Sequence, residues 1–491
     1  MNIQPKYCSL FAWALFLTLS LTPAGADVPE PATPGLLAPP RQVPQEKVLP
    51  GPVQEPRLHF NLSQVLERTL SQAPSLEEGL ARLRQRSYEI DEAYTLVNPK
   101  ASFQSQYQRI EPPLSFPGGP VIQPADNYSF ALTLSQPIYT FGRLRYSTLA
   151  AKLSRRSEQE TYLRTLQELI SGAADLYIRA LLANDAVTIA EDQLAAQKAN
   201  LKTSTLLAEQ GVVARFDVLR TGAATSEAEQ DLIEAKTSRE LAIKQLKSVL
   251  NLNFQQPIDL QKLELTAPPQ LDLEEKKTRV LEQRSDLRAL RWAVEAARAR
   301  VHLARSENSP SLSIQNQTVN RNATGLSPGT QNTTSLVFSI PLSDGGASKA
   351  RALQAEAQVD QMLAQLENRE RQVMLEVEEA YARLQDRWSS IEVTENNVSQ
   401  AEEAARIAKL RYQNGLSTSV ELLQAQADLS RARYSLNQAQ ASYHQALWQW
   451  YRVGGEEFPV EVPLPPEVRE RLETARLESS GRSTLRIRAE Q

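Results

Sequence analysis

Residues 126–147 read DNYSFALTLSQPIYTFGRLRYS, and within this stretch the chain changes from one periodicity to another. In its first half, apolar side chains alternate with small ones, at Tyr128, Phe130, Leu132 and Leu134. A period of two with one apolar face, ending at Pro137, is typical of a β-strand. From Arg143 to Gln256 the chain contains no proline, which predicts long helices because proline interrupts them.

A second proline-free block lies between Leu342 and Phe458, and both blocks carry apolar residues at alternating spacings of three and four. In the first block this seam comprises Leu163, Leu166, Ile170, Ala173, Tyr177 and Ala180. In the second block it comprises Met374, Val377, Tyr381, Leu384, Trp388 and Ile391. Such heptads predict coiled-coil hairpins over 143–250 and 347–454. In the first block a second seam of apolar residues overlaps the first, so one helix could contact a neighbour on each side. This favours a wall of helices, with an ordinary antiparallel bundle as the alternative.

The two blocks are copies of each other. The differences Pro341 minus Pro137, Gly346 minus Gly142, Tyr381 minus Tyr177 and Gly415 minus Gly211 all equal 204. This coincidence predicts an internal duplication, with one structural repeat over 58–256 and another over 257–458. Each repeat would contain two strands, at about 101–110 and 127–136 and at about 311–320 and 333–341. The fold class is therefore mainly α with a small β part.

The predicted strands have about 8–10 residues each, which is the length that a tilted strand needs to cross a bilayer. A small soluble sheet that caps a helical bundle is the alternative. Four strands cannot close a barrel, and open strand edges are not tolerated in hydrocarbon. The sequence therefore predicts a barrel shared between subunits. Three chains would supply twelve strands, although two or four chains would also allow closure.

Both ends of the chain differ in composition from the repeats. Residues 1–26 have the pattern of a secretory signal peptide, with an apolar run from Leu10 to Leu21 followed by small residues. A transmembrane anchor is the alternative, but that run is shorter than the ~20 residues that a span requires. Residues 27–57 are rich in proline, and this composition predicts a disordered leader or else a docking arm. We expect residues 459–491 to form a charged tail.

The composition points away from several classes of function. The net charge is −4, so no basic surplus favours binding to nucleic acid. His59, His302 and His444 lie far apart in sequence, and the only cysteine is Cys8. We therefore expect no metal site, no disulfide framework and no cofactor. The chain lacks a glycine-rich phosphate loop and the GxSxG and HExxH motifs, so nothing in the sequence indicates an enzyme.

Two helix openings and two turns carry a more specific signal. Asn61–Leu66 reads NLSQVL and opens the first half, while Arg284–Leu287 reads RSDL and opens the second. The turns are Gln210–Leu219, QGVVARFDVL, and Tyr412–Leu423, YQNGLSTSVELL. In this order and with this duplication, the segments resemble the outer-membrane efflux protein family typified by TolC. The resemblance covers about residues 58–456.

The resemblance implies a trimeric conduit in the cell outer membrane. Members of the family are expected to share a twelve-stranded barrel between three chains and to extend an α-helical tunnel into the periplasm. They join a periplasmic adaptor protein and an inner-membrane pump in tripartite efflux or type I secretion, so no catalytic residue is expected here. The alternative function is a periplasmic coiled-coil adaptor of the membrane-fusion type. A secreted structural coiled-coil protein is a third possibility, but it has no use for amphipathic strands.

The resemblance also implies functional residues at the two hairpin tips. An acid follows each tip glycine at the same distance, and both Asp217 and Glu421 would also suit the dipole of the returning helix. In a symmetric trimer each acid forms a ring that favours cations, and we expect a pore constriction formed by Asp217, Glu421, Gln424 and Tyr412. Tyr412 could equally be a packed aromatic. Gln424 and Ser417 replace an acid and an arginine common in the family, so its closing mechanism does not transfer intact.

The exposed turns themselves predict the contact with the adaptor. A glycine at each turn permits the tight reversal at the far end of a long helix. The residues expected to contact the adaptor are Gly211, Val212, Val213, Ala214, Gly415, Leu416 and Ser417.

Overall fold

The computed structural model describes residues 58–115, 118–119, 121–123, 125–269, 272–322 and 329–455. The predicted signal peptide, leader and tail lie outside the described residues. The first part of the chain contains β1 (Leu58–Phe60), α1 (Leu62–Gln72), α2 (Pro74–Tyr94), the 3₁₀ turn η1 (Thr95–Val97), β2 (Lys100–Arg109), β3 (Leu114–Ser115), β4 (Val121–Gln123), β5 (Asp126–Tyr139), α3 (Arg143–Glu209) and α4 (Arg215–Val249). The second contains β6 (Ile258–Leu260), α5 (Leu273–Gln283), α6 (Ser285–Ser306), β7 (Ser311–Arg321), β8 (Thr330–Ser339), α7 (Ala347–Gln413) and α8 (Ser419–Gly454).

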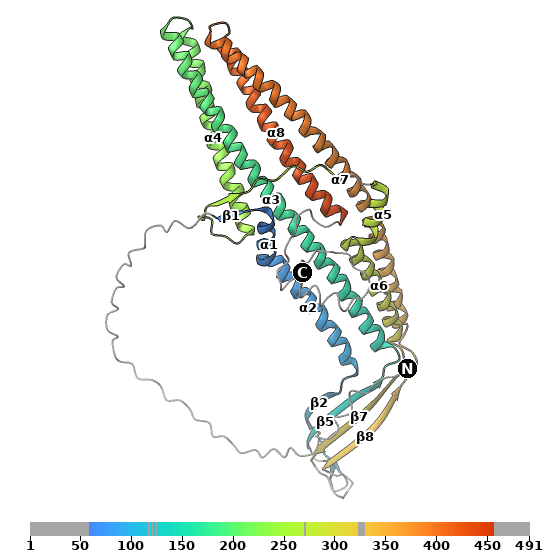
Figure 1. Ribbon diagram of the computed structural model, residues 1–491. Coiled ribbons are helices and arrows are strands. Elements are labelled where there is room, and N and C mark those ends of the chain that lie inside the picture. The colour runs from blue at the N-terminus through green and yellow to red at the C-terminus, as the bar shows by residue number, and fades with distance from the viewer. Residues whose placement is uncertain are drawn as a thin grey trace, which may run out of the picture. The chain divides into compact units, whose positions relative to one another are not determined.

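Two long helical hairpins, α3–α4 and α7–α8, dominate the described part of the chain (Figure 1). Helices α3 and α7 have 67 residues each, which corresponds to about 100 Å at the usual rise per residue. Both begin after a glycine in the left-handed region, Gly142 with φ 98° and Gly346 with φ 88°. That conformation favours glycine because it has no Cβ. Among the described residues, every helix is too short or too polar to cross a membrane.

The short helices pack along the long ones. Helices α1 and α2 contact α3, while α6 contacts both α3 and α7. The heptad seam of α3 is buried as predicted from Leu166 to Ala180, with Leu166, Ile170 and Tyr177 inside the first core, but its first position, Leu163, is only half-buried. One position of the predicted α7 seam is wrong, because Met374 is 41% exposed whereas the adjacent Val373 is fully buried. Helices α6 and α8 pack against the side of α7 that holds Val373, so the seam begins one residue earlier.

A parallel pairing between β1 and β6 joins the starts of the two repeats, and the sequence pattern did not predict it. Tyr177, which is fully buried on α3, closes this junction. Its hydroxyl contacts the carbonyl oxygens of Phe60 at 3.1 Å and Gln261 at 2.6 Å. The pair of short strands is thereby fixed to the middle of the long helix.

The four long strands form one antiparallel sheet in the order β2-β5-β7-β8 (Figure 1). Strand β5 is longer than the predicted 127–136, because it passes Pro137 and ends at Tyr139. The pairing with β7 shifts register between these two residues, and such an irregularity accommodates a proline. Strand β8 begins at Thr330 and ends at Ser339, before the predicted end at 341.

One face of this sheet is uncovered in the single chain, and it is apolar on β2, on β5 and at the end of β8, whereas its β7 part is polar, at Asn316, Thr318 and Asn320. Phe103 lies opposite Leu132, and Tyr107 lies opposite Tyr128. The large exposed side chains of the face are Phe103, Tyr107, Tyr128, Phe130, Leu132, Leu134, Leu336 and Phe338. On β5, the residues between them are Ser129, Ala131, Thr133 and Ser135. Exposed apolar surfaces of this kind usually contact lipid or another protein.

Candidate functional site at the hairpin tips

The tip site consists of two turns, 210–214 between α3 and α4 and 414–418 between α7 and α8. Gly211 and Gly415 have φ values of 73° and 69°, and each follows the C-cap residue of its helix, Gln210 or Asn414. The N–H of Val212 donates to the carbonyl of Leu207 at 2.9 Å, and Leu416 donates in the same way to Arg411 at 2.8 Å. Both turns are therefore Schellman motifs, in which glycine is favoured by its backbone conformation.

The two turns lie against each other. A Cβ built on Gly415 would come within 3.3 Å of a methyl carbon of Val212, which belongs to the other turn. The hydroxyl of Ser419 donates to the carboxylate of Asp217, and the Ser419 side chain is buried. Asp217 is half-buried in the first turn of α4, while Ser419 begins α8. This bond joins the two hairpins at their ends.

Glu421 has a different environment from Asp217. It is exposed in the first turn of α8, and the hydroxyl of Ser417 donates to it at 2.6 Å. Its backbone N–H donates to the Thr418 side chain, which caps the helix. Gln424 is also exposed, and its amide donates to Asp428 at 3.0 Å. Within one chain, the structure therefore gives Asp217 and Glu421 separate serine partners.

Tyr412 packs inside the chain rather than on its surface. Its side chain is 1% exposed, and its hydroxyl lies 2.8 Å from the hydroxyl of the fully buried Ser204 on α3. Of the two alternatives that the sequence left open, a packed aromatic describes its surroundings within the single chain. The contact forms a second bond between the hairpins, next to the one between Asp217 and Ser419.

A polar layer below the tips was missed by sequence reasoning. Asn200 of α3 donates to Gln426 of α8 and to Gln197 at 3.4 Å, and all three side chains are buried. Thr225 of α4 donates to the backbone carbonyl of Gln197. The available signal was the spacing of three between Gln197 and Asn200, which continues the seam of α3 with amides. Because buried amides are stable only when paired, this layer fixes the register of α3 against α8.

The tip site exposes apolar side chains among polar ones. Val212 is 53% and Leu416 is 70% exposed, and Gly211, Ala214 and Gly415 are also exposed, whereas Val213 and Ser417 are half-buried. The first turns of the returning helices add exposed apolar residues that were not predicted: Phe216, Leu219 and Val420. Within the described ranges, no cluster of three or more His, Cys, Asp or Glu residues could hold a metal ion.

Comparisons with known proteins agree with this architecture. The sequence profile of the outer membrane efflux protein family matches residues 65–252 and 278–456. The chain is 25% identical over 347 residues to the alkaline protease secretion protein AprF of Pseudomonas aeruginosa, covering 67% of this chain and 69% of AprF. It is 26% identical over 381 residues to protein CyaE of Bordetella pertussis, covering 76% and 79%. The solved outer membrane protein VceC from Vibrio cholerae has a TM-score of 0.70 at 20% identity, covering 81% of this chain and 96% of VceC.

These matches confirm the predicted family and fold class. The likeness to VceC shows the fold, and the profile match includes both hairpins and the sheet. The prediction of a channel component is confirmed and the adaptor alternative is wrong, since the matching family is that of the efflux proteins themselves. The predicted location in the outer membrane is confirmed by the same match. The chain belongs to the outer membrane efflux protein family.

Proposed function

We propose that three copies of this chain form a continuous conduit for efflux or type I secretion, which joins a periplasmic adaptor and an inner-membrane pump. The observation that carries the proposal is the four-stranded sheet. Within the described residues, β2 and β8 each pair on one side only. Together with the uncovered apolar face, these open edges favour a barrel closed by identical chains in outer-membrane lipid. Three chains supply twelve strands, an even number suited to a polar lumen.

An apolar stripe on α7 supports assembly of the helical part. Leu353, Leu375, Val393 and Ile407 are exposed in the single chain. At 3.6 residues per turn, their spacings place them within about 40° of each other around the helix. Leu363, Met374 and Leu410 are also exposed and lie to one side of these four, so the apolar residues form a band of about 120° along most of α7. A band of this width is the pattern of a helix face that packs against other helices. We assign it to the contact between neighbouring chains of the conduit.

The experiment that tests the proposal is mass determination and planar-bilayer conductance of the detergent-purified protein. We expect the mass of three chains after correction for detergent, and ion conductance by that species. A protein that is monomeric and stays in solution without detergent would contradict the proposed conduit.

The acids of the tips are proposed to form rings at the narrow end of the conduit. Replacing Glu421 with alanine removes three exposed carboxylates from a trimer. Each unit charge at about 8 Å in water contributes roughly 0.5 kcal/mol to the potential felt by a cation. We therefore expect the preference for cations over anions to fall at least about twofold in planar-bilayer recordings. Glu227→Ala, which removes an exposed acid of α4 outside the tip, should leave the preference unchanged. An unaltered preference in Glu421→Ala would remove Glu421 from the proposed ring.

The exposed turns are proposed to bind the adaptor through their apolar residues, Val212 and Leu416 above all. A charged side chain at either position would have to be desolvated on binding. We expect the double variant Val212→Asp, Leu416→Asp to reduce the amount of adaptor that copurifies from the source membranes by about tenfold or more. Conductance in planar bilayers should persist, because neither side chain is buried. Tyr88→Asp changes an equally exposed residue on α2 and should copurify the adaptor normally.

A further inference from the structure

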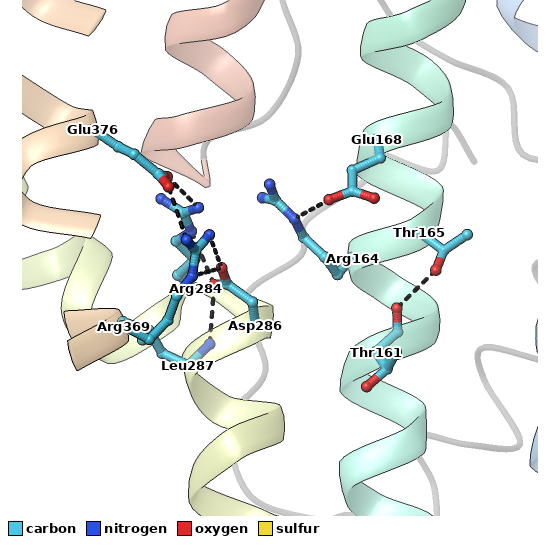
Figure 2. Close-up of polar contacts among 9 residues, drawn as sticks. All are labelled: Thr161, Arg164, Thr165, Glu168, Arg284, Asp286, Leu287, Arg369 and Glu376. Carbon is cyan, nitrogen blue, oxygen red and sulfur yellow. Dashed lines mark hydrogen bonds and ion pairs between the residues drawn. The ribbon is translucent and has the colours of Figure 1, made fainter. Parts of the chain in front are cut away.

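A buried charge cluster lies where the junction of α5 and α6 meets α7 (Figure 2). The side chain of Arg284 is 1% exposed, and it contacts Asp286 at 2.9 Å and Glu376 of α7 at 2.6 Å. Arg369 of α7 contacts the same two carboxylates, at 2.8 Å and 2.9 Å. These four groups form a closed ring of two guanidinium groups and two carboxylates. By itself the ring is electrically balanced.

Two further arginines approach the ring from other helices. Figure 2 shows the guanidinium of Arg164 reaching from α3 toward the side of Arg284, while its own partner is Glu168 at 2.8 Å. Arg452 stands in the last turn of α8. Burial lowers the pKa of Arg452, and the charges of Arg164 and Arg284 lower it further, while those of Glu168 and Glu376 act to raise it. The cluster therefore contains four guanidinium groups and only three carboxylates, which leaves one positive charge without a counter-charge among the described residues.

The same place contains buried hydrogen-bond donors without acceptors. Nη1 of Arg284 and Nη1 of Arg164 are both buried, and neither has a hydrogen-bond partner among the described residues. Arg452 is half-buried, and it forms no ion pair with any described residue. A buried cationic N–H without an acceptor is costly, so such groups are normally satisfied by protein, water or ligand. Because two of these unpartnered donors belong to neighbouring positively charged groups, the partner that they favour most is an anion.

We propose that Arg164, Arg284 and Arg452 bind one small inorganic anion at the meeting point of α3, α6 and α8. The anion accepts from the free guanidinium nitrogens of Arg164 and Arg284 and neutralises the surplus charge that Arg452 brings. Since α3 belongs to the first repeat and α6 and α8 to the second, the bound anion joins the two repeats. It stabilises the folded chain in proportion to its occupancy.

Calorimetric titration of the full-length, detergent-solubilised protein tests this site. The probes are inorganic phosphate and chloride, each replacing gluconate as the bulky reference anion at constant ionic strength. We expect at least one of them to bind at about one anion per chain. Arg452→Gln should weaken that binding at least about tenfold, because one charge-assisted contact is lost. Arg298→Gln, which changes an exposed arginine of α6 paired with Glu295, should bind as the unmodified chain does.

The proposal is overturned if neither anion binds, or if Arg452→Gln binds as tightly as the unmodified chain. A carboxylate of the chain itself is the competing occupant, since Glu456 and Glu457 follow Gly455 just after α8 in the sequence. If phosphate or chloride bound only after Glu456→Gln and Glu457→Gln were introduced into the full chain, that carboxylate would be the occupant. That result would also overturn the proposal.

Discussion

Replacing Arg284 with methionine is expected to destabilise the protein by about 3–5 kcal/mol per chain. The arginine lies almost completely inside the protein, and it holds Asp286 and Glu376 in place. Methionine fills much of the space but supplies no positive charge, so both carboxylates lose one of their two guanidinium partners in a poorly solvated place. The free energy of unfolding in detergent, from guanidinium chloride titration, measures the effect. The proportion of chains that reach the outer membrane should fall in parallel.

The matched control is Arg298→Met, which removes an arginine from the same helix whose side chain is 52% exposed. Its effect on the free energy of unfolding should remain within about 0.5 kcal/mol, as for most surface substitutions. Equal losses in the two variants would show that the buried ring contributes no more than a surface ion pair.

Lowering the pH should weaken the same ring, and the direction of this change in stability follows from the pKa of Asp286. Burial acts to raise its pKa, but Arg284 and Arg369 outweigh burial and hold the pKa below its usual range. The stabilisation is therefore complete above the pKa of an unfolded aspartate and is lost as the pH falls through the lower folded pKa. In Arg284→Met this acid-dependent part of the unfolding free energy should shrink.

The long elements could be predicted because each follows a pattern that can be recognised along the sequence alone. The absence of proline marked both hairpins, and the glycines that reverse them were identified at 211 and 415. The period of two marked β5, although its end at Tyr139 depended on a register shift that alternation alone does not reveal. By contrast, the pairing of β1 with β6 joins short segments about two hundred residues apart, and three residues are too few for a recognisable period.

The tip site shows why the partners of functional residues are harder to predict than the residues. The duplication places Glu421 at the position that corresponds to Asp217, as the constant offset predicts. It does not reproduce their serine partners. Ser419 corresponds to Arg215, and Ser417 corresponds to Val213, so each acid has a neighbour that the other repeat lacks. The bond between Ser419 and Asp217 therefore joins a serine of the second hairpin to an acid of the first, and it has no counterpart in which the roles of the hairpins are exchanged.

Leu132→Arg and Thr133→Arg are expected to have opposite outcomes although the two residues are adjacent. Leu132 belongs to the exposed apolar face of β5, opposite Phe103, while Thr133 lies on the other face beside Gln317. If the apolar face contacts lipid, an arginine there costs about 2–4 kcal/mol per chain at mid-membrane depth. Three chains would multiply that cost by three. Leu132→Arg should therefore abolish insertion into the outer membrane, measured by fractionation and by conductance of the recovered protein.

Thr133→Arg should insert normally, because its face would line the polar lumen of a closed barrel, where substitutions change selectivity rather than stability. In planar bilayers the added ring of positive charge is expected to reduce the preference for cations. Normal insertion of Leu132→Arg together with failure of Thr133→Arg would reverse the assignment of the two faces. Because the residues are neighbours on one strand and receive the same side chain, the strand propensity of the introduced arginine is the same in both variants. The difference between them therefore depends on which side of the sheet contacts the membrane.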